Sequence, residues 1–310
     1  MFANKRILVT GGCGFIGSHV VDALRDQNQV VVVDNLSSGT QFTFDNVEYH
    51  FTSVQDTITS GELLSQFRPH LVFHLAALPR IQPSFDSPIE HDEANVRPVM
   101  SLMRGLQDLG SASNLEAVVI SSSSSCYGDP TQIPTSEQSA IDPLSPYALQ
   151  KYASEMYGLI LGSRWNIPVT SLRYFNVYGP RSFNPSSRFN AYSSVVGIFL
   201  DQFKKAIPLT ITGDGSQERD FIHVADVVAA NFVAAANIEV TRNRYFNVGL
   251  GVPVSIRKLA EAFDSDLVYI EARQGESRIT CADNSALKAL GWRPTINVFD
   301  FIASEVERYA

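Results

Sequence analysis

Short apolar runs rich in β-branched residues alternate along the chain with segments of helical periodicity. The apolar runs, which we interpret as buried parallel strands, span residues 6–10, 30–34, 71–76, 117–122 and 169–176. Amphipathic helical patterns lie between them, near residues 15–26, 94–109 and 146–163. This alternation predicts an α/β fold in which a doubly wound parallel sheet carries helices on both faces.

The pattern loosens after Asn176, where "YGPRSFNPSSRFN" is rich in Pro, Ser and Asn and predicts a loop. "YFNVG" at 245–249 predicts a strand that returns to the sheet. We therefore expect a sheet domain formed by residues 1–179 together with about 221–249. Residues of about 180–220 and 250–310 would form a smaller C-terminal lobe.

Composition narrows the classes of partner. The chain has 310 residues and a net charge of −8, so it offers no overall electrostatic attraction for nucleic acid. No apolar run reaches the roughly 18 residues of a membrane helix, and the N-terminus is too short and polar for a signal peptide. Cys13, Cys126 and Cys281 lack disulfide or metal-ligand spacing. These features predict reduced thiols, a cytoplasmic location, no metal, and neither a nucleic-acid nor a membrane partner.

A glycine-rich turn joins the first predicted strand to the first predicted helix. Gly11, Gly14 and Gly17 recur at intervals of three in "ILVTGGCGFIGSHVVDAL". Such a turn lets a pyrophosphate approach the backbone at a helix N-terminus. Asp34 at the end of the second strand can accept hydrogen bonds from ribose hydroxyls and would repel a 2′-phosphate. The motif therefore predicts NAD rather than NADP.

Five serines, 121–125, directly follow a predicted core strand, where a ligand would meet the sheet in this architecture. Ser145-Pro146 predicts the start of a helix, which places Tyr147 and Lys151 on one face. The ordinary pKa of a tyrosine is about 10, and a neighbouring ammonium would lower it and favour phenolate. The pair therefore suggests a base that removes a proton from a substrate hydroxyl, with one of the serines bonded to the same oxygen.

The segments "TGGCGFIGSH", "SSSSSCYG", "YALQK" and "LRYFNVYGPR" together resemble the extended short-chain dehydrogenase/reductases. The resemblance is strongest to nucleotide-sugar epimerases of the UDP-galactose (UDP-hexose) 4-epimerase type, and it extends from Arg6 to about Pro294. It implies a Rossmann sheet with a C-terminal substrate-binding lobe. It also implies tightly bound NAD, recycled in each turnover, and inversion at C4 of a UDP-sugar through a transient 4-keto sugar.

The resemblance also implies roles for individual residues. The catalytic residues would be Ser123, Tyr147 and Lys151. The NAD contacts would be Gly11, Gly14, Phe15, Ile16, Asp34, Asn35, Ser38, Val54, Asp56, Ala76, Ala77, Asn95, Tyr147, Lys151 and Tyr174. The substrate contacts would be Ser123, Asn176, Asn190, Ser194, Val195, Arg219, Arg273, Glu276 and Thr280.

The choice of sugar stays open at this point. Thr280 occupies the position that limits the C2 substituent, and its small side chain leads us to expect that N-acetylated sugars are admitted beside UDP-glucose and UDP-galactose. Arg80 in the unusual segment "ALPRIQPS" could bind a carboxylate, which would favour a UDP-glucuronate 4-epimerase or decarboxylase. Thr52-Ser53 replaces the usual Gly-Asp, which leaves a contact from Ser53 to the cofactor in doubt.

A dehydratase and a non-catalytic NAD-binding sensor fit the residues less well. Related 4,6-dehydratases carry Asp-Glu where this chain has Ser124 and Ser125, which argues against dehydration. A sensor would typically have lost the Tyr-Lys pair. The resemblance further implies a homodimer formed by a four-helix bundle. The apolar stripe Val99, Leu102, Met103 and Leu106 fits such a helix, but such a stripe is more often that of an ordinary core helix.

Overall fold

Seven parallel strands form the central sheet of the computed structural model, which describes residues 2–37, 42–59, 61–110, 113–183, 194–272 and 277–309. In spatial order the strands are β10 (Arg244–Val248), β6 (Val169–Tyr174), β5 (Ala117–Ser123), β4 (Leu71–His74), β1 (Arg6–Thr10), β2 (Gln29–Val33) and β3 (Glu48–His50). β10 pairs in parallel with β6, as expected for a strand that returns to the sheet. The doubly wound α/β fold expected from the sequence is confirmed.

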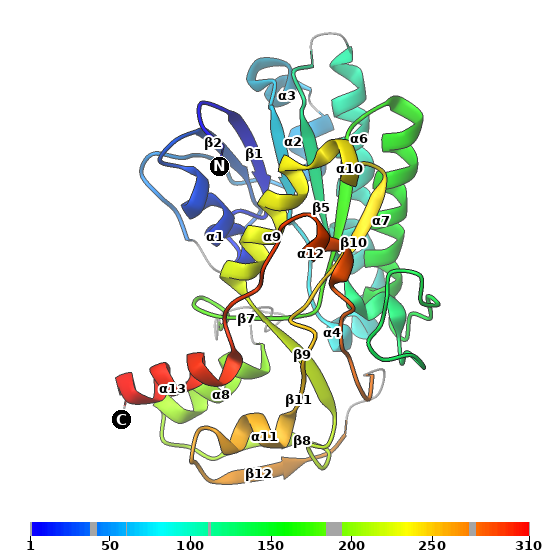
Figure 1. Cartoon of the computed structure of the whole chain (residues 1–310). Helices are drawn as coiled ribbons and strands as arrows, with labels where there is room; N and C mark the ends of the chain where they lie inside the picture. The colour runs from blue at the N-terminus through cyan, green and yellow to red at the C-terminus, as the bar shows by residue number, and fades with distance from the viewer. Residues whose placement is uncertain are drawn as a thin grey trace.

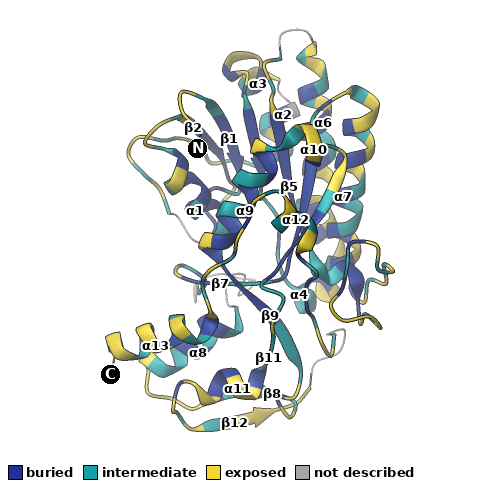
Figure 2. Cartoon of the chain, viewed as in Figure 1, coloured by how far each residue is buried: buried dark blue, intermediate teal, exposed yellow. Residues whose placement is uncertain are grey.

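Both faces of the sheet are covered by helices, and Figure 2 shows its strands buried. Because successive strand residues point to opposite faces, Ile7 and Val9 pack on the side of α1 (Phe15–Leu24) and α9 (Val224–Ala236). Leu8 packs on the other side. The helices there are α2 (Val54–Thr59), α3 (Glu62–Phe67), α6 (Arg97–Asp108) and α7 (Pro146–Trp165).

The apolar stripe of α6 belongs to this second core. Val99, Leu102, Met103 and Leu106 are at most 2% exposed and contact the sheet side rather than solvent. The stripe is therefore explained by packing within one chain, and it is not available as a subunit interface.

A smaller lobe lies below the sheet in Figure 1. It contains a three-stranded sheet of β7 (Asn176–Tyr178), β9 (Glu218–His223) and β11 (Pro253–Ser255), and a parallel pair, β8 (Leu209–Thr212) with β12 (Leu267–Ile270). Its helices are α8 (Val195–Lys204), α11 (Ile256–Glu261) and α13 (Val298–Tyr309). Tyr178, Phe199, Phe221 and Phe263 lie in a core of its own.

The division into two domains stays a proposal. Leu287 on α12 (Ser285–Ala289) and Trp292 lie in the range assigned to the lobe, yet they pack in the core between the sheet, α1 and α9. The Trp292 indole N–H donates to the carbonyl of Asp226 at 2.9 Å. The last segments of the chain therefore contact both parts.

Short helices connect the larger elements. They are α4 (Ile81–Asp86), α5 (Pro88–Asn95), η2 (Ser124–Tyr127) and α10 (Ile238–Thr241). Within the described ranges, no helix combines the length and the apolar character needed to cross a membrane.

Candidate active site

A cavity of about 350 Å³ opens at the carboxyl ends of β1, β2, β4 and β5. β1 lies between β2 and β4. After β1 the chain adds β2 and β3 on one side of it, and then crosses over to add β4 and the later strands on the other side. Ligands of open α/β sheets bind at such a switch point. Twelve of the residues expected to contact NAD line the cavity: Gly11, Gly14, Phe15, Ile16, Asp34, Asn35, Val54, Ala76, Ala77, Tyr147, Lys151 and Tyr174.

The glycine turn forms the floor of this cavity because side chains would not fit there. Gly11 has a φ of +71°, and a Cβ on it would lie 2.6 Å from the backbone nitrogen of Ala76. A Cβ on Gly17 would lie 2.0 Å from the carbonyl oxygen of Gly11. Gly14 is the N-cap of α1. The bare backbone and the helix N-terminus together fit a pyrophosphate.

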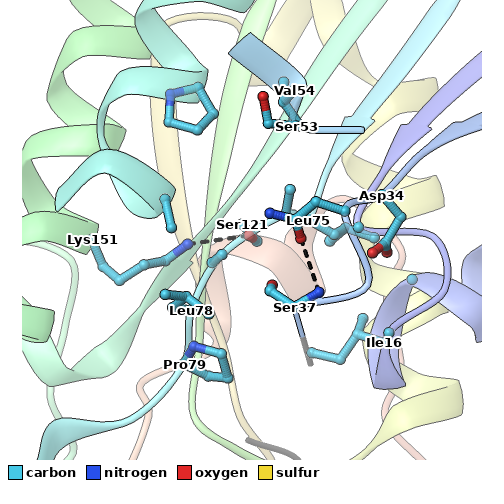
Figure 3. Close-up of a pocket in the computed structure, with 18 of the residues that line it drawn as sticks. Ile16, Asp34, Ser37, Ser53, Val54, Leu75, Leu78, Pro79, Ser121 and Lys151 are labelled. Carbon is cyan, nitrogen blue, oxygen red and sulfur yellow. Dashed lines mark hydrogen bonds between the residues drawn. The ribbon is translucent and has the colours of Figure 1, made fainter. Parts of the chain in front are cut away.

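Asp34 is held rigidly beside the turn. Its carboxylate accepts hydrogen bonds from the N–H groups of Cys13 at 2.9 Å and Leu36 at 2.8 Å. Burial raises the pKa of this carboxyl, and the two backbone bonds oppose that rise. The carboxylate lies in the cavity wall, where it can accept hydrogen bonds from ribose hydroxyls (Figure 3).

Two of the expected cofactor residues that the structure describes, Asp56 and Asn95, do not line the cavity. The Asp56 carboxylate accepts a hydrogen bond from the Ser53 hydroxyl at 2.5 Å. Ser53, and not Asp56, lines the cavity. Asn95 is buried and bonds to both backbone groups of Leu78, so it shapes the wall without reaching it. Ser38 lies outside the described residues. The position of Ser53 therefore supports the contact that the sequence left in doubt.

Ser123 and Tyr147 meet at the end of β5. Ser123 is the last residue of the strand, and its hydroxyl oxygen accepts from the N–H and the hydroxyl of Ser125, at 3.2 and 2.9 Å. Tyr147 is the second residue of α7, and its N–H donates to the hydroxyl of Ser84 at 3.0 Å. Burial raises the pKa of the Tyr147 phenol, and a hydrogen bond with Ser123 opposes that rise.

Lys151 lies one turn along α7 from Tyr147, in the same cavity wall. Its ammonium donates to the hydroxyl of Ser121 at 3.3 Å, as Figure 3 shows. Burial lowers the pKa of Lys151 to about 8, and the charge of Glu155 opposes this. Lys151 therefore loses its proton more readily than an ordinary lysine.

Ser121 and Ser122 were not among the expected site residues, and both line the cavity. Side chains alternate along a strand, so a strand that aims Ser123 at Tyr147 also aims Ser121 at the same helix. That signal was readable from the sequence. Ser122 points the other way, and its buried hydroxyl has no hydrogen-bond partner among the described residues. An unpartnered polar atom in this wall fits a cofactor that would bond to it.

Some of the expected substrate residues come together away from this cavity. The side-chain amide of Asn176 donates to the hydroxyl of Thr280 at 3.2 Å. Thr280 belongs to a segment, 277–284, that we call the strap. The strap joins β9 to the loop after η2: its Arg278 bonds through backbone groups to Glu218 and to the carboxylate of Asp129, both at 2.9 Å.

The other expected substrate residues are more scattered. Arg219 donates to the carbonyl oxygens of Glu218 at 2.9 Å and Arg278 at 3.4 Å, beside the strap. Ser194 caps α8 by accepting from the N–H of Gly197 at 3.0 Å, and Val195 begins that helix. Asn190, Arg273 and Glu276 lie outside the described residues.

Comparison with known proteins agrees with this geometry. The family model for the NAD dependent epimerase/dehydratase family matches residues 7–249. A UDP-glucose 4-epimerase of Mycolicibacterium smegmatis is 35% identical over 97% of both chains. The structure of UDP-glucose 4-epimerase from Thermotoga maritima with UDP-glucose has a TM-score of 0.88 and 34% identity over 97% of both chains.

Two further solved structures differ in their sugars. One is a UDP-N-acetylglucosamine 4-epimerase from Methanobrevibacter ruminantium in complex with UDP-N-acetylmuramic acid. It has a TM-score of 0.88 and 32% identity over 99% of this chain and 98% of that one. The other is a UDP-glucuronic acid 4-epimerase from Bacillus cereus in complex with UDP-glucuronic acid and NAD. It has a TM-score of 0.84 and 26% identity over 97% of this chain and 98% of that one. The fold, the glycine turn, the Ser-Tyr-Lys arrangement and these matches agree, and the chain belongs to the NAD-dependent epimerase/dehydratase family, as its motifs predicted.

Proposed function

We propose that this protein is an NAD-dependent UDP-hexose 4-epimerase that interconverts UDP-glucose and UDP-galactose and also accepts their N-acetylated counterparts. The observation that carries the proposal is the placement of Tyr147, which bonds to Ser123 and stands one turn before Lys151 in the cavity wall. A phenol that is bonded to a hydroxyl and shares a cavity wall with an ammonium is suited to abstract a proton from an alcohol.

In the proposed cycle, the Tyr147 phenolate takes the proton of the sugar 4-hydroxyl, while Ser123 bonds to the same oxygen. The Lys151 ammonium stabilises the phenolate and would hold the nicotinamide ribose. When bound, NAD would supply the hydride chemistry at C4: hydride would leave C4 to the nicotinamide, the 4-keto sugar would swing about its phosphate linkage, and hydride would return to its other face. Tyr147 then gives its proton back to the O4 oxygen, so enzyme and cofactor end each cycle unchanged and NAD can stay bound.

The substrate would extend from Ser123 towards the lobe. Asn176 and Thr280 touch each other at the strap, which supports a shared place near the sugar. We propose that Arg219, together with Arg273 and Glu276, holds the nucleoside diphosphate, with Asn190, Ser194 and Val195 along its other side. Guanidinium groups suit phosphate oxygens. Thr280 is small, which would leave room for an N-acetyl group at C2.

The function is tested by incubating the purified protein separately with UDP-galactose, UDP-N-acetylgalactosamine and UDP-glucuronic acid, with products followed by proton NMR. We expect inversion at C4 of the first two. The ratio of their rates measures how freely Thr280 admits the N-acetyl group. No conversion of any sugar by protein that contains NAD would overturn the proposal.

A second candidate, a UDP-glucuronate 4-epimerase, is favoured by one observation. Arg80 precedes α4, and α4 is attached to the start of α7 by the bond from the Tyr147 N–H to Ser84. Burial raises the pKa of the Tyr147 phenol, and the charge of Arg80 is one of the causes that oppose this rise, so this cation acts at the reacting end of the sugar site. A C6 carboxylate would be attracted to such a position.

Replacing Arg80 separates the two candidates. If the uronate is the substrate, Arg80→Ala should lower kcat/KM for UDP-glucuronic acid by about 10- to 100-fold more than for UDP-galactose, the range of a charge-assisted hydrogen bond. Any loss that comes through the Tyr147 pKa would be shared by both sugars. Steady-state kinetics on both sugars measure this. Arg104→Ala removes an exposed guanidinium from α6 and serves as the control. Equal losses on both sugars would count against a carboxylate-binding role.

We also propose a homodimer, with the outer face of α7 as its centre. Leu149, Tyr157 and Ile160 are 57%, 43% and 58% exposed and recur at helical spacing, while Ile89 on the neighbouring α5 is 76% exposed. These side chains, rather than the α6 stripe, are available to a second copy. The three cysteines are buried and unpaired, in keeping with a cytoplasmic location, which we also propose.

Ile160→Lys should convert the dimer to a monomer, because it places a charge in an apolar interface. Light scattering after gel filtration would then give a mass near 34.1 kDa instead of twice that value. Val268→Lys, on the exposed face of β12, is the matched control and should leave the mass unchanged. A wild-type protein that runs as a monomer would remove the proposal.

A further inference from the structure

A charged pair lies buried behind the catalytic helix. Glu155 on α7 and Arg173 on β6 are 0% and 1% exposed, and the Nη2 atom of Arg173 lies 2.5 Å from Oε1 of Glu155. The Nε–H of Arg173 donates to the other carboxylate oxygen at 3.0 Å. Burying two charges costs much of what their attraction returns, so an apolar pair would serve stability as well. The pair therefore needs an explanation other than stability.

Arg173 also reaches the turn that follows Ser123. Its Nη1 donates to the hydroxyl of Tyr127 at 2.7 Å, and its guanidinium carbon lies 4.9 Å from the centre of the Tyr127 ring. The Tyr127 hydroxyl in turn donates to the side chain of Asn247 on β10 at 2.8 Å. One guanidinium thus connects η2, which Ser123 caps, to the helix that carries Tyr147 and Lys151.

Glu155 follows Lys151 by one helical turn, so the two side chains emerge on the same side of α7. Both are buried, and the charge of Glu155 opposes the effect of burial on the pKa of Lys151. Other titratable or charged groups lie around Lys151. Tyr147 on its own helix, Tyr174 on β6 and Glu90 and Glu93 on α5 line the same cavity, His74 on β4 has its pKa affected by the lysine charge, and Arg173 on β6 is paired with Glu155. Glu155 is the one whose charge raises the lysine pKa.

We propose that Glu155 and Arg173 are positioning residues for the catalytic group. Arg173 fixes the serine turn against α7, and Glu155 supplies the buried negative charge that keeps Lys151 an ammonium. The catalytic consequence rests on the epimerase function proposed above. The charge state of Lys151 can be measured without turnover, so the two proposals fail separately.

The first test is a titration of the holoprotein labelled with ¹³C at lysine Cε. The chain has six lysines, and Lys151→Met assigns the signal of interest. Glu155→Gln should lower the midpoint of the Lys151 signal by about one pH unit or more, because the buried ammonium loses the anion one helical turn away. An unchanged midpoint overturns the proposal. If Glu155→Gln does not fold, the double variant Glu155→Gln/Arg173→Met removes both charges and is judged in the same way.

Turnover gives the second test. In Glu155→Gln the alkaline fall of kcat/KM should move to lower pH with the NMR midpoint. Tyr127→Phe should lower kcat several-fold and leave KM and the pH profile unchanged. It removes the bond between η2 and Arg173 but leaves the charges near Lys151 in place. Glu116→Gln, at the exposed ion pair with Lys5, is the control. A Glu155→Gln variant that merely loses stability, with a wild-type pH profile, would refute the role. If the wild type converts no sugar, the proposed function fails. The titration still tests whether Glu155 keeps Lys151 protonated.

Discussion

Tyr147→Phe is expected to lower kcat by about 1,000-fold, within the range that general acid-base catalysis contributes. The substitution removes the phenol oxygen that bonds to Ser123 and leaves the ring that lines the cavity. Binding of NAD should therefore be retained. Product formation followed by NMR, together with the NAD content of the purified protein, measures both.

Two further variants are compared with Tyr147→Phe. Ser123→Ala removes a neutral hydrogen bond only, so we expect a loss of about 5-fold, since such a bond contributes roughly 1 kcal/mol. Tyr269→Phe on β12 removes an exposed phenol from the lobe and should have no effect. A Tyr147→Phe variant that keeps more than a tenth of wild-type kcat would disprove the assignment of the base.

Lys151→Met is expected to lower kcat/KM by about 100-fold below pH 8 and to abolish the alkaline fall of activity. Burial lowers the pKa of Lys151 to about 8, so the group is an ammonium below that pH and neutral above it. Of the two forms of Lys151, only the ammonium carries a charge that can stabilise the Tyr147 phenolate. In the wild type, kcat/KM should therefore fall as pH rises through about 8, and the methionine variant, which has no proton to lose, should lack this step.

The measurement is a pH series of initial rates from pH 6 to 10. Lys258→Met on α11, an exposed lysine far from the cavity, should reproduce the wild-type profile. If the alkaline step persists in Lys151→Met at the same pH, another group is responsible for it.

Much of the cofactor side of the site follows from short local patterns. A strand, a glycine turn and a helix are contiguous in the sequence, so steric demands at Gly11 and Gly17 can be anticipated from the motif alone. Tyr147 and Lys151 share one helix, and their relation is fixed by the helical repeat. These parts were predictable because few long-range contacts are needed to define them.

Features that depend on long-range packing were not predicted. The segment 77–95 contains Pro83 and Pro88 and no clear period, and it forms the short helices α4 and α5 against α7. The α6 stripe favoured the core over an interface only as the commoner case, because both bury apolar residues, and the packing of the whole chain was needed to place it in the core. The bond between Asn176 and Thr280 joins positions 104 residues apart, and no local pattern specifies it.

The return of β10 to the sheet has a consequence for the order of folding. β6 finds its outer partner 70 residues later, after α8, β8 and β9 of the lobe have been synthesised, and Tyr174 bonds to Asn231 on α9 at 2.9 Å. A nascent chain that has emerged only as far as residue 179 exposes the unpaired edge of β6, which is a template for aggregation. The cofactor-binding half is therefore not an independent folding module, and the ribosome must release residues up to about 248 before its sheet can close.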